Sequence, residues 1–181
     1  INDDDRTYIG SPHPDFTAGL SAQFQYKGFD LDMDFYGVYG RDLINYVSRW
    51  INFRNFQGNR SKARLYESWG SPYLDNNENA TLPICESSDM GSQRPSTFFL
   101  EDGSYLRLKR LQIGYTLPRD ITNSIQLNRV RIYGHITNVF TLTNYSGLDP
   151  AGVIQGDMNM GVDSGVWPTP RSFIIGLDIG I

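Results

Sequence analysis

The sequence predicts an all-β fold in which long antiparallel strands form a segment of a transmembrane β-barrel. Two observations carry this prediction. Among the last eleven residues, Phe173, Ile175, Leu177, Ile179 and Ile181 lie on one side of a strand and Ser172, Gly176, Asp178 and Gly180 on the other. Residues 16–27 show the same period of two for twelve residues. Stripes of this length need an apolar cover, which a second sheet or lipid could provide.

The composition supports strands and excludes several classes of protein. Aromatic residues make up 13% of the 181 residues and charged residues 20%, a mixture that suits strands and interfaces better than helical bundles. The net charge is −4 and basic residues never run beyond two, which argues against nucleic-acid binding. The single cysteine, Cys85, excludes an internal disulfide and a cysteine-rich metal site. A transmembrane helix is excluded because no window of about eighteen apolar residues exists.

The first two predicted strands, 16–27 and 29–40, form a hairpin around the turn signal Lys27-Gly28. Each has about twelve residues, whereas about nine to eleven suffice for a tilted strand to cross a bilayer and strands of globular proteins usually have about five or six. The second faces of both strands carry Gln, Lys and Asp, which suit water better than the closed interior of a sandwich.

Three more strands are predicted at 104–117, 129–141 and 171–181. In the first of these the apolar face switches near Lys109-Arg110, which a β-bulge would explain; projection of the upper strand beyond the membrane would explain it equally well. Residues 118–127 form a short connection with about one helical turn. Of the long connections, 41–100 could hold helical turns at 41–49 and a short helix at 61–69, and 142–169 is rich in Gly, Asp, Asn and Pro.

The connections alternate between short and long. This asymmetry is typical of outer-membrane barrels, whose turns are short on the periplasmic side and whose loops are long outside. The long outer loops are then 41–100 and 142–169. By the same alternation the last strand runs inward, and the C-terminus is periplasmic.

The segment 101–118, Glu-Asp-Gly-Ser-Tyr-Leu-Arg-Leu-Lys-Arg-Leu-Gln-Ile-Gly-Tyr-Thr-Leu-Pro, resembles the C-terminal hallmark of the SusC/RagA family of TonB-linked outer-membrane transporters of Bacteroidetes. Further matches lie in order on both sides and cover most of the chain apart from the middle of the 41–100 loop. They are 5–12 with 14–16, 26–31, 138–141, 145–150 and 168–171.

This resemblance implies a 22-stranded barrel, a plug, a TonB-contacting segment and a SusD-like surface lipoprotein as partner. Residues 1–181 would then be the C-terminal part of the barrel, about its last five strands, without the plug and the TonB-contacting segment. The implied function is TonB-dependent import of oligosaccharides or oligopeptides across the outer membrane, with no enzymatic activity. Such barrels commonly end on an aromatic residue, and this sequence ends on Ile181.

Two groups of side chains are candidates for substrate binding. Asp30, Asp32 and Asp34 form an acidic ladder on one strand face, which could bind hydroxyl-rich solutes or cations or could simply be the wet face of a strand. Five loop aromatics could stack on cargo or contact the lipoprotein, or could form a small core of the loop itself: Tyr46, Trp50, Tyr66, Trp69 and Tyr73. The acidic ladder lacks the two differing carboxylate environments that a glycosidase needs.

No catalytic residue, cofactor or metal site is assigned from the sequence. His13 and His135 are too isolated for a metal site, and no nucleophile and base can be paired. Family members often carry a calcium-type loop just before the first strand, and the resemblance would place Asp5 at its closing position, behind ligands that precede this chain. A solvated acidic loop is the alternative for Asn2-Asp3-Asp4-Asp5.

A second hypothesis is a soluble β-sandwich that binds glycans through aromatic loops, and a third is a glycoside hydrolase domain. A sandwich predicts that the stripes at 16–26 and 173–181 face each other across a dry core. A barrel predicts that both stripes point to lipid, with Gln23, Asp32 and Asp178 pointing to water.

Overall fold

A computed structural model describes residues 3–53, 58–86, 91–124, 126–153 and 156–181. The chain divides into two compact units, each assembled from three segments. The first contains residues 1–13, 42–102 and 145–167, and the second contains 14–41, 103–144 and 168–181. We call them the loop unit and the sheet unit.

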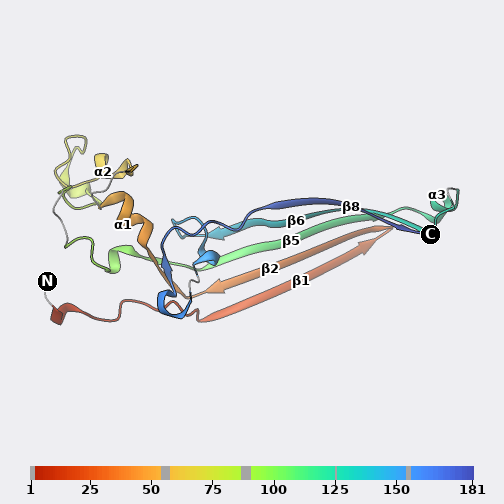
Figure 1. The fold of residues 1–181 in the computed structure, drawn as a ribbon, viewed down its shortest axis with the longest axis horizontal. Helices are drawn as coiled ribbons and strands as arrows, with labels where there is room; N and C mark the ends of the chain where they lie inside the picture. Colours follow the sequence, from red (N-terminus) through yellow and green to blue (C-terminus); the bar gives the residue numbers. More distant parts are fainter. Residues whose placement is uncertain (1–2, 54–57, 87–90, 125, 154–155) are drawn as a thin grey trace. The chain divides into compact units, whose positions relative to one another are not determined.

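The sheet unit is one antiparallel sheet of five strands in the order β1-β2-β5-β6-β8 (Figure 1). The strands are β1 (Phe16–Tyr26), β2 (Phe29–Tyr39), β5 (Tyr105–Thr116), β6 (Arg129–Thr143) and β8 (Ser172–Gly180). All five predicted strands are therefore confirmed, with ends within two residues of the predicted ones. Each strand pairs with the next long strand along the chain, which is an up-and-down order.

Short connections join these strands at one end of the sheet. Lys27 and Gly28 both have positive φ, 47° and 87°, as a two-residue hairpin turn of type I′ requires. The helix α3 (Arg119–Ser124) joins β5 to β6 and confirms the predicted helical turn. Thr122 is buried there, and its backbone oxygen accepts a 3.0 Å hydrogen bond from Leu127 N.

Irregular pairing at Lys109, with both β2 and β6, keeps the apolar residues of β5 on one face. Lys109 is an extra residue against β2, where the register shifts between Asp34 and Phe35. The pairing of β5 with β6 also shifts between Leu108 and Arg110, opposite Asn138, whose φ is 51°. The predicted bulge is confirmed. Its effect is to place Leu106 and Leu108 on the same side of the sheet as Leu111 and Ile113, because they pair with Gly37 and Phe35.

The two faces of the sheet differ in chemistry. One face, the apolar face, is largely open to solvent in this chain, with exposures of 58% at Phe24, 70% at Phe173 and 86% at Ile175. Gln23 pairs with Asp32, and Asp178 with Arg131, so these side chains share the opposite face, which we call the polar face. The stripes of β1 and β8 lie on one face of a single sheet and do not face each other, so the sandwich arrangement is wrong.

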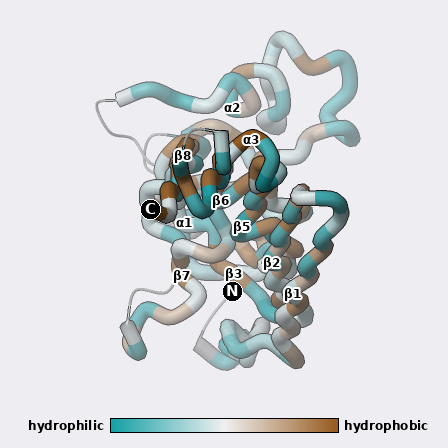
Figure 2. Tube along the Cα trace, turned by 90° about the vertical axis from the view of Figure 1, so that its right-hand side faces the viewer, coloured by the Kyte–Doolittle hydropathy of each residue, from teal (hydrophilic) through white to brown (hydrophobic). Residues whose placement is uncertain are grey.

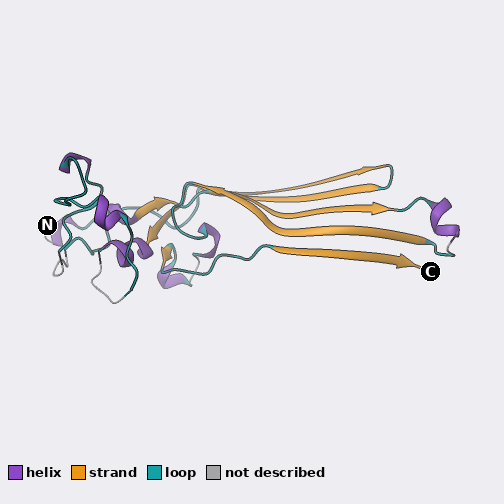
Figure 3. Cartoon of the chain, turned by 90° about the horizontal axis from the view of Figure 1, so that it is seen from above, coloured by secondary structure: helices purple, strands orange, loops and turns teal. Residues whose placement is uncertain are grey.

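The loop unit contains a small sheet of three strands in the order β4-β3-β7, formed by β3 (Asp42–Asn45), β4 (Leu100–Asp102) and β7 (Val162–Asp163). Its described residues form the helices α1 (Tyr46–Asn52) and α2 (Ala63–Tyr66) and the 3₁₀ turns η1 (Asp3–Asp5), η2 (Asn77–Asn79), η3 (Thr97–Phe99), η4 (Pro150–Gly152) and η5 (Asp157–Asn159). The drawing by secondary structure shows how little of this unit is regular (Figure 3).

Two expectations for residues 41–69 need correction. The helical turns expected at 41–49 begin only at Tyr46, because Asp42–Asn45 pairs with β4 and β7. The expected helix at 61–69 is limited to α2. Ser61 Oγ accepts a hydrogen bond of 3.1 Å from Ala63 N, but the structural N-cap is Lys62. A strand that pairs with distant segments overrides local helical preference here.

The loop unit has two small clusters of buried apolar side chains. Phe53, Leu82 and Phe99 form one, with Ile44 and Ala63 packed against it. Leu43, Tyr145 and Val153 form the other. Strand β3 contributes to both clusters, and it binds the two long connections together, since it pairs with β4 from 41–100 and with β7 from 142–169.

No helix among the described residues is long and apolar enough to cross a membrane.

Candidate functional site

The polar face of the sheet carries a row of cross-strand pairs at the acidic ladder. Asp30, Asp32 and Asp34 lie on β2 between β1 and β5, with Gln25, Gln23 and Ser21 opposite them on β1. On β5 the opposite residues are Gly114, Gln112 and Arg110. The two-residue period of β2 therefore sets three carboxylates in line, and the neighbouring strands supply amides, a hydroxyl and a cation beside them.

Arg131 contacts two carboxylates of the polar face. Its Nε and Nη2 lie 2.9 and 2.5 Å from the two oxygens of Asp30, a bidentate pair, and its Nη1 lies 3.2 Å from Asp178 Oδ2. The side chains of Arg131 and Asp30 are only 13% and 16% exposed. The guanidinium also lies over the ring of Tyr133, 4.9 Å from its centroid.

Glycine makes this bidentate contact possible. Asp30 is two strands away from Arg131, and the residue between them on β5 is Gly114. A Cβ at position 114 would lie 2.5 Å from both oxygens of Asp30 and 2.6 Å from Arg131 Nη2. The ion pair thus crosses β5 through the space that Gly114 leaves open.

The other two carboxylates of the ladder are paired as well. Asp34 Oδ2 lies 2.7 Å from Arg110 Nε, and Asp32 Oδ2 accepts a hydrogen bond of 3.1 Å from Gln112 Nε2. Each of the three carboxylates therefore has a partner on another strand. Whether the ladder also contacts cargo stays a prediction.

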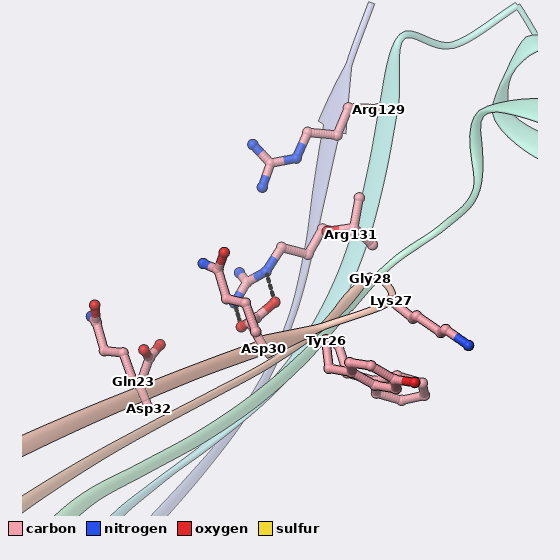
Figure 4. A pocket seen from close by; sticks show the side chains of 11 residues that line it. Gln23, Tyr26, Lys27, Gly28, Asp30, Asp32, Arg129 and Arg131 are labelled. Atoms are coloured by element: carbon pink, nitrogen blue, oxygen red, sulfur yellow. Dashed lines mark hydrogen bonds and ion pairs between the residues drawn. The ribbon is translucent and has the colours of Figure 1, made fainter.

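A hollow of about 560 Å³ lies on the turn side of this row. Polar groups of Gln23, Gln25, Asp30, Asp32, Arg129 and Arg131 line it, together with the hairpin turn at Lys27-Gly28 (Figure 4). In Figure 4 the dashed contacts join Arg131 to Asp30, while Arg129 extends beside them. The hollow has hydrogen-bond donors and acceptors of both charges, so it can hold water or a polar solute.

The loop unit has its own polar network. Asn45 Nδ2 donates hydrogen bonds to Glu101 Oε1 at 2.9 Å and to Ser146 Oγ at 3.0 Å. Glu101 also accepts hydrogen bonds from Ser146 N and Ser146 Oγ, both at 2.8 Å. Tyr145 donates from its hydroxyl to Asp163 Oδ2 at 2.6 Å.

Asp163 closes this network on the β7 side. Its second oxygen, Oδ1, accepts hydrogen bonds from Gly165 N at 2.8 Å and Val166 N at 3.3 Å, and the residue is 2% exposed. The network therefore ties β3, β4 and the two parts of the 142–169 loop together. This network was not predicted from the sequence. Two of its residues, Tyr145 and Ser146, lie in the segment 145–150, which resembles the family.

The five predicted loop aromatics lie outside the two buried clusters of the loop unit. Trp50, Tyr66, Trp69 and Tyr73 are 36 to 61% exposed, and Tyr46 is half-buried. Tyr66 and Tyr73 contact each other, with ring centroids 5.5 Å apart, and Arg49 lies 4.7 Å from the Tyr46 ring centroid. The alternative that these five form the core of the loop is wrong, because Phe53, Leu82 and Phe99 do so.

The described part of the N-terminal acidic segment is the 3₁₀ turn η1, in which Asp4 and Asp5 are exposed, and Asn2 lies outside the described residues. No group of three or more His, Cys, Asp and Glu side chains that could hold a metal ion occurs among the described residues. A closing role of Asp5 in a calcium loop stays a prediction.

No family model matches the chain. The chain is 34% identical over 185 residues to TonB-dependent receptor P3 of Formosa agariphila and 26% identical over 181 residues to TonB-dependent receptor SusC of Bacteroides thetaiotaomicron, and each match covers 99% of the chain. The chain spans only 18% of the length of P3 and 16% of that of SusC.

Solved structures give the same result. The chain superimposes on the RagAB peptide transporter with a TM-score of 0.80 at 26% identity, over 99% of this chain and 19% of the other. The 'closed-closed' state of the RagAB peptide importer gives a TM-score of 0.78 with the same identity and coverage. The relatives are named as receptors and transporters.

Proposed function

We propose that this chain, which belongs to the SusC-like TonB-dependent receptors, forms part of the barrel wall and outer loops of an outer-membrane nutrient importer. The observation that carries the proposal is the sheet itself. Its strands have 9 to 15 residues, one face is a continuous apolar surface open to the outside, and the other is polar. About nine to eleven residues suffice for a tilted strand to cross a bilayer.

The direction of the strands is part of this proposal. The short connections, Lys27-Gly28 and the α3 segment, belong to the periplasmic side, and the long connections 41–100 and 142–169 belong to the outer side. The C-terminus then lies on the periplasmic side. Closure into a barrel of 22 strands would need further strands at the two sheet edges, β1 and β8, whose outer backbone groups would otherwise be left without partners in lipid.

In this proposal the importer works without chemistry of its own. Cargo enters from the outer side, a SusD-like lipoprotein covers the barrel, and TonB delivers the energy. A peptide cargo is supported by the likeness to a peptide transporter at 26% identity, and an oligosaccharide cargo is the alternative. The exposed aromatics of the loop unit, above all the Tyr66–Tyr73 pair, are the side chains that we propose for contact with cargo or lipoprotein. The polar face would line the lumen.

The membrane part of the proposal can be tested in the full-length protein. Strands in lipid should be protected from hydrogen exchange, and residues 16–26 and 172–180 should be labelled only slowly in detergent micelles. Protection of these strands together with extraction only by detergent is the expected result. Release of the protein into the soluble fraction without detergent would contradict the proposal.

The loop aromatics can be tested separately. Replacing Tyr66 and Tyr73 together by Ala should weaken uptake of the cargo about tenfold and leave the amount of barrel in the outer membrane unchanged, because neither ring belongs to the buried clusters. The matched control is Leu65→Ala, an exposed position on the same helix. Equal uptake by the double variant and the control would remove these two side chains from the proposed site.

Disrupting the polar network should lower the stability of the loop unit itself. Asp163→Ala leaves the Tyr145 hydroxyl and two backbone N–H groups without their partner in a site that is 2% exposed. Unsatisfied buried groups cost about 1–3 kcal/mol each, so we expect the loop unit to become sensitive to protease while the strands stay protected. Limited proteolysis followed by mass spectrometry measures this. Unchanged cleavage of 145–167 would show that the network does not stabilise the loop unit.

A further inference from the structure

The irregular pairing at Lys109 brings three basic residues of β5 to the polar face. In a regular strand, residues 107 and 109 would lie on one face and residue 110 on the other. Here Lys109 is an extra residue against β2, because Arg107 pairs with Tyr36 and Arg110 with Asp34. Tyr36 and Asp34 are two residues apart on β2 and share the polar face, so Arg107 and Arg110 share it as well.

Lys109 itself also extends over the polar face, since its Nζ lies 5.3 Å from the centroid of the Tyr36 ring. The apolar residues around it remain on the apolar face, namely Leu106, Leu108 and Leu111. Figure 2 shows hydrophilic and hydrophobic residues alternating along these strands. Three cations within four residues of β5 therefore lie on one face, and we call Arg107, Lys109 and Arg110 the basic cluster.

The neighbouring carboxylates of β2 do not balance the charge of the basic cluster. Asp34 is paired with Arg110, and Asp32 accepts its hydrogen bond from Gln112. Within the part of the chain that the structure describes, Lys109 makes no ion pair. Lys109 is exposed, and the side chain of Arg110 is 41% exposed. Two of the three cations are therefore open to a ligand on the polar face.

Small side chains flank the basic cluster on the neighbouring strands. On β1, Gly19 and Ser21 pair with this part of β2, and on β6 Thr137 lies opposite Arg110. A Cβ at Gly19 would have no contact closer than 4.0 Å. Large side chains at these paired positions do not cover the two accessible cations, so an extended ligand can reach them.

Two tyrosine rings beside the basic cluster are in contact with cations. Arg107 is 7% exposed, its Nε donates a hydrogen bond of 2.8 Å to Thr141 Oγ1, and its guanidinium carbon lies 5.5 Å from the centroid of the Tyr105 ring. Tyr36 and Tyr105 contact each other, with ring centroids 6.3 Å apart. A ring with a cation over its face has less surface left for stacking on a sugar. The groups that this region presents to a ligand are therefore charges.

Resting on the proposed importer function, in which the polar face lines the lumen, we infer that Lys109 and Arg110 bind carboxylates of the cargo and that this region selects acidic oligopeptides. A guanidinium and an ammonium group side by side suit a carboxylate, because one offers fixed N–H donors and the other a compact charge. Glu and Asp side chains of a peptide supply such carboxylates. A positive surface in a narrow space also raises the local concentration of anions.

Binding of two matched peptides to the full-length protein tests the inference. Both are Ala/Ser peptides of about nine residues with blocked ends, and they differ only in carrying Glu or Gln at the same positions. Titration calorimetry in non-ionic detergent at low salt measures their affinities. We expect the wild type to bind the Glu peptide about tenfold more tightly than the Gln peptide. Lys109→Gln should weaken binding of the Glu peptide about fivefold and leave that of the Gln peptide unchanged.

Two control variants separate charge from position. Lys109→Arg keeps the positive charge and should keep the preference for the Glu peptide. Arg129→Met removes a cation at the hollow on the turn side, away from the basic cluster, and should leave the preference unchanged. A variant that does not fold is recognised by loss of heat-resistant migration in gels. Raising the salt to about 0.5 M then tests the wild type alone, because screening should bring the affinities for the two peptides together.

Equal affinity of the wild type for the two peptides would overturn the inference, and so would an equal loss for both peptides in Lys109→Gln. Weaker binding of trigalacturonate by Lys109→Gln, with binding of the Glu peptide unchanged, would overturn it as well, because the cations would then recognise an acidic sugar. None of these results touches the importer proposal, which fails only if the full-length protein is released without detergent or its strands exchange freely.

Discussion

Replacing Arg131 by Met should strongly destabilise the sheet. The guanidinium is the partner of both oxygens of Asp30 and of one oxygen of Asp178, and the pair is only 13–16% exposed. Removing one partner of a buried ion pair leaves an uncompensated charge, which costs about 3–5 kcal/mol. We expect the full-length barrel to unfold at a clearly lower urea concentration, measured by the loss of heat-resistant migration in gels.

A double variant separates the effect of the unpaired charge from the effect of the lost packing. The double variant Asp30→Asn with Arg131→Met removes the buried carboxylate together with the guanidinium. Asp178 also loses Arg131, but its side chain is 53% exposed, so the loss should be clearly smaller than in Arg131→Met alone. Arg129→Met, beside the same hollow, is the second control, and it should change stability by less than about 1 kcal/mol, which is usual for exposed charges. A loss in Arg129→Met as large as that in Arg131→Met would show that the ion pair is not the reason.

Replacing Gly114 by Val should be the second large effect. A Cβ at this position would lie 2.5 Å from the carboxylate of Asp30, closer than real contacts allow. The side chain would push Asp30 and Arg131 apart and separate their bidentate contact, so we expect a loss of about 3 kcal/mol or more, the ion pair and the overpacking together. Urea unfolding of the full-length protein measures it.

Gly134→Val is the control for this substitution. It is also a strand glycine, on the neighbouring strand β6, but a Cβ there would have no heavy atom within 4 Å. It should cost little, because no neighbouring atom has to move to admit the side chain. If both variants lose the same stability, the loss comes from replacing any strand glycine by Val and not from the ion pair across β5.

Much of the sheet could be predicted from the sequence alone. The period of two at 16–26 and 172–180 and the turn signal at Lys27-Gly28 are local properties, and so the strands and the hairpin follow from them. The sequence also shows the switch of the apolar face at Lys109, and the bulge at this residue explains it. The resemblance of residues 101–118 gave the family.

The pairs on the polar face could not be predicted. The sequence shows Asp30, Asp32 and Asp34 as three like charges in a row, and only the register of three strands brings Arg131, Gln112 and Arg110 to them, from 76 to 101 residues away. The role of Gly114 has the same origin, because its missing side chain matters only where Asp30 and Arg131 meet.

The loop unit depended on tertiary structure most of all. Aromatic residues in a loop give no sign of which of them are buried, and here Phe53 and Phe99 are buried while Trp69 and Tyr73 stay exposed. Strand β3 replaced expected helical turns because β4 and β7, which come from two different loops, pair with it. The sequence by itself determined the strands, their apolar face and the family, since these rest on local periodicity and motifs. Only the tertiary structure decided which charges are paired and which rings form a core, because those depend on segments that are far apart in the chain.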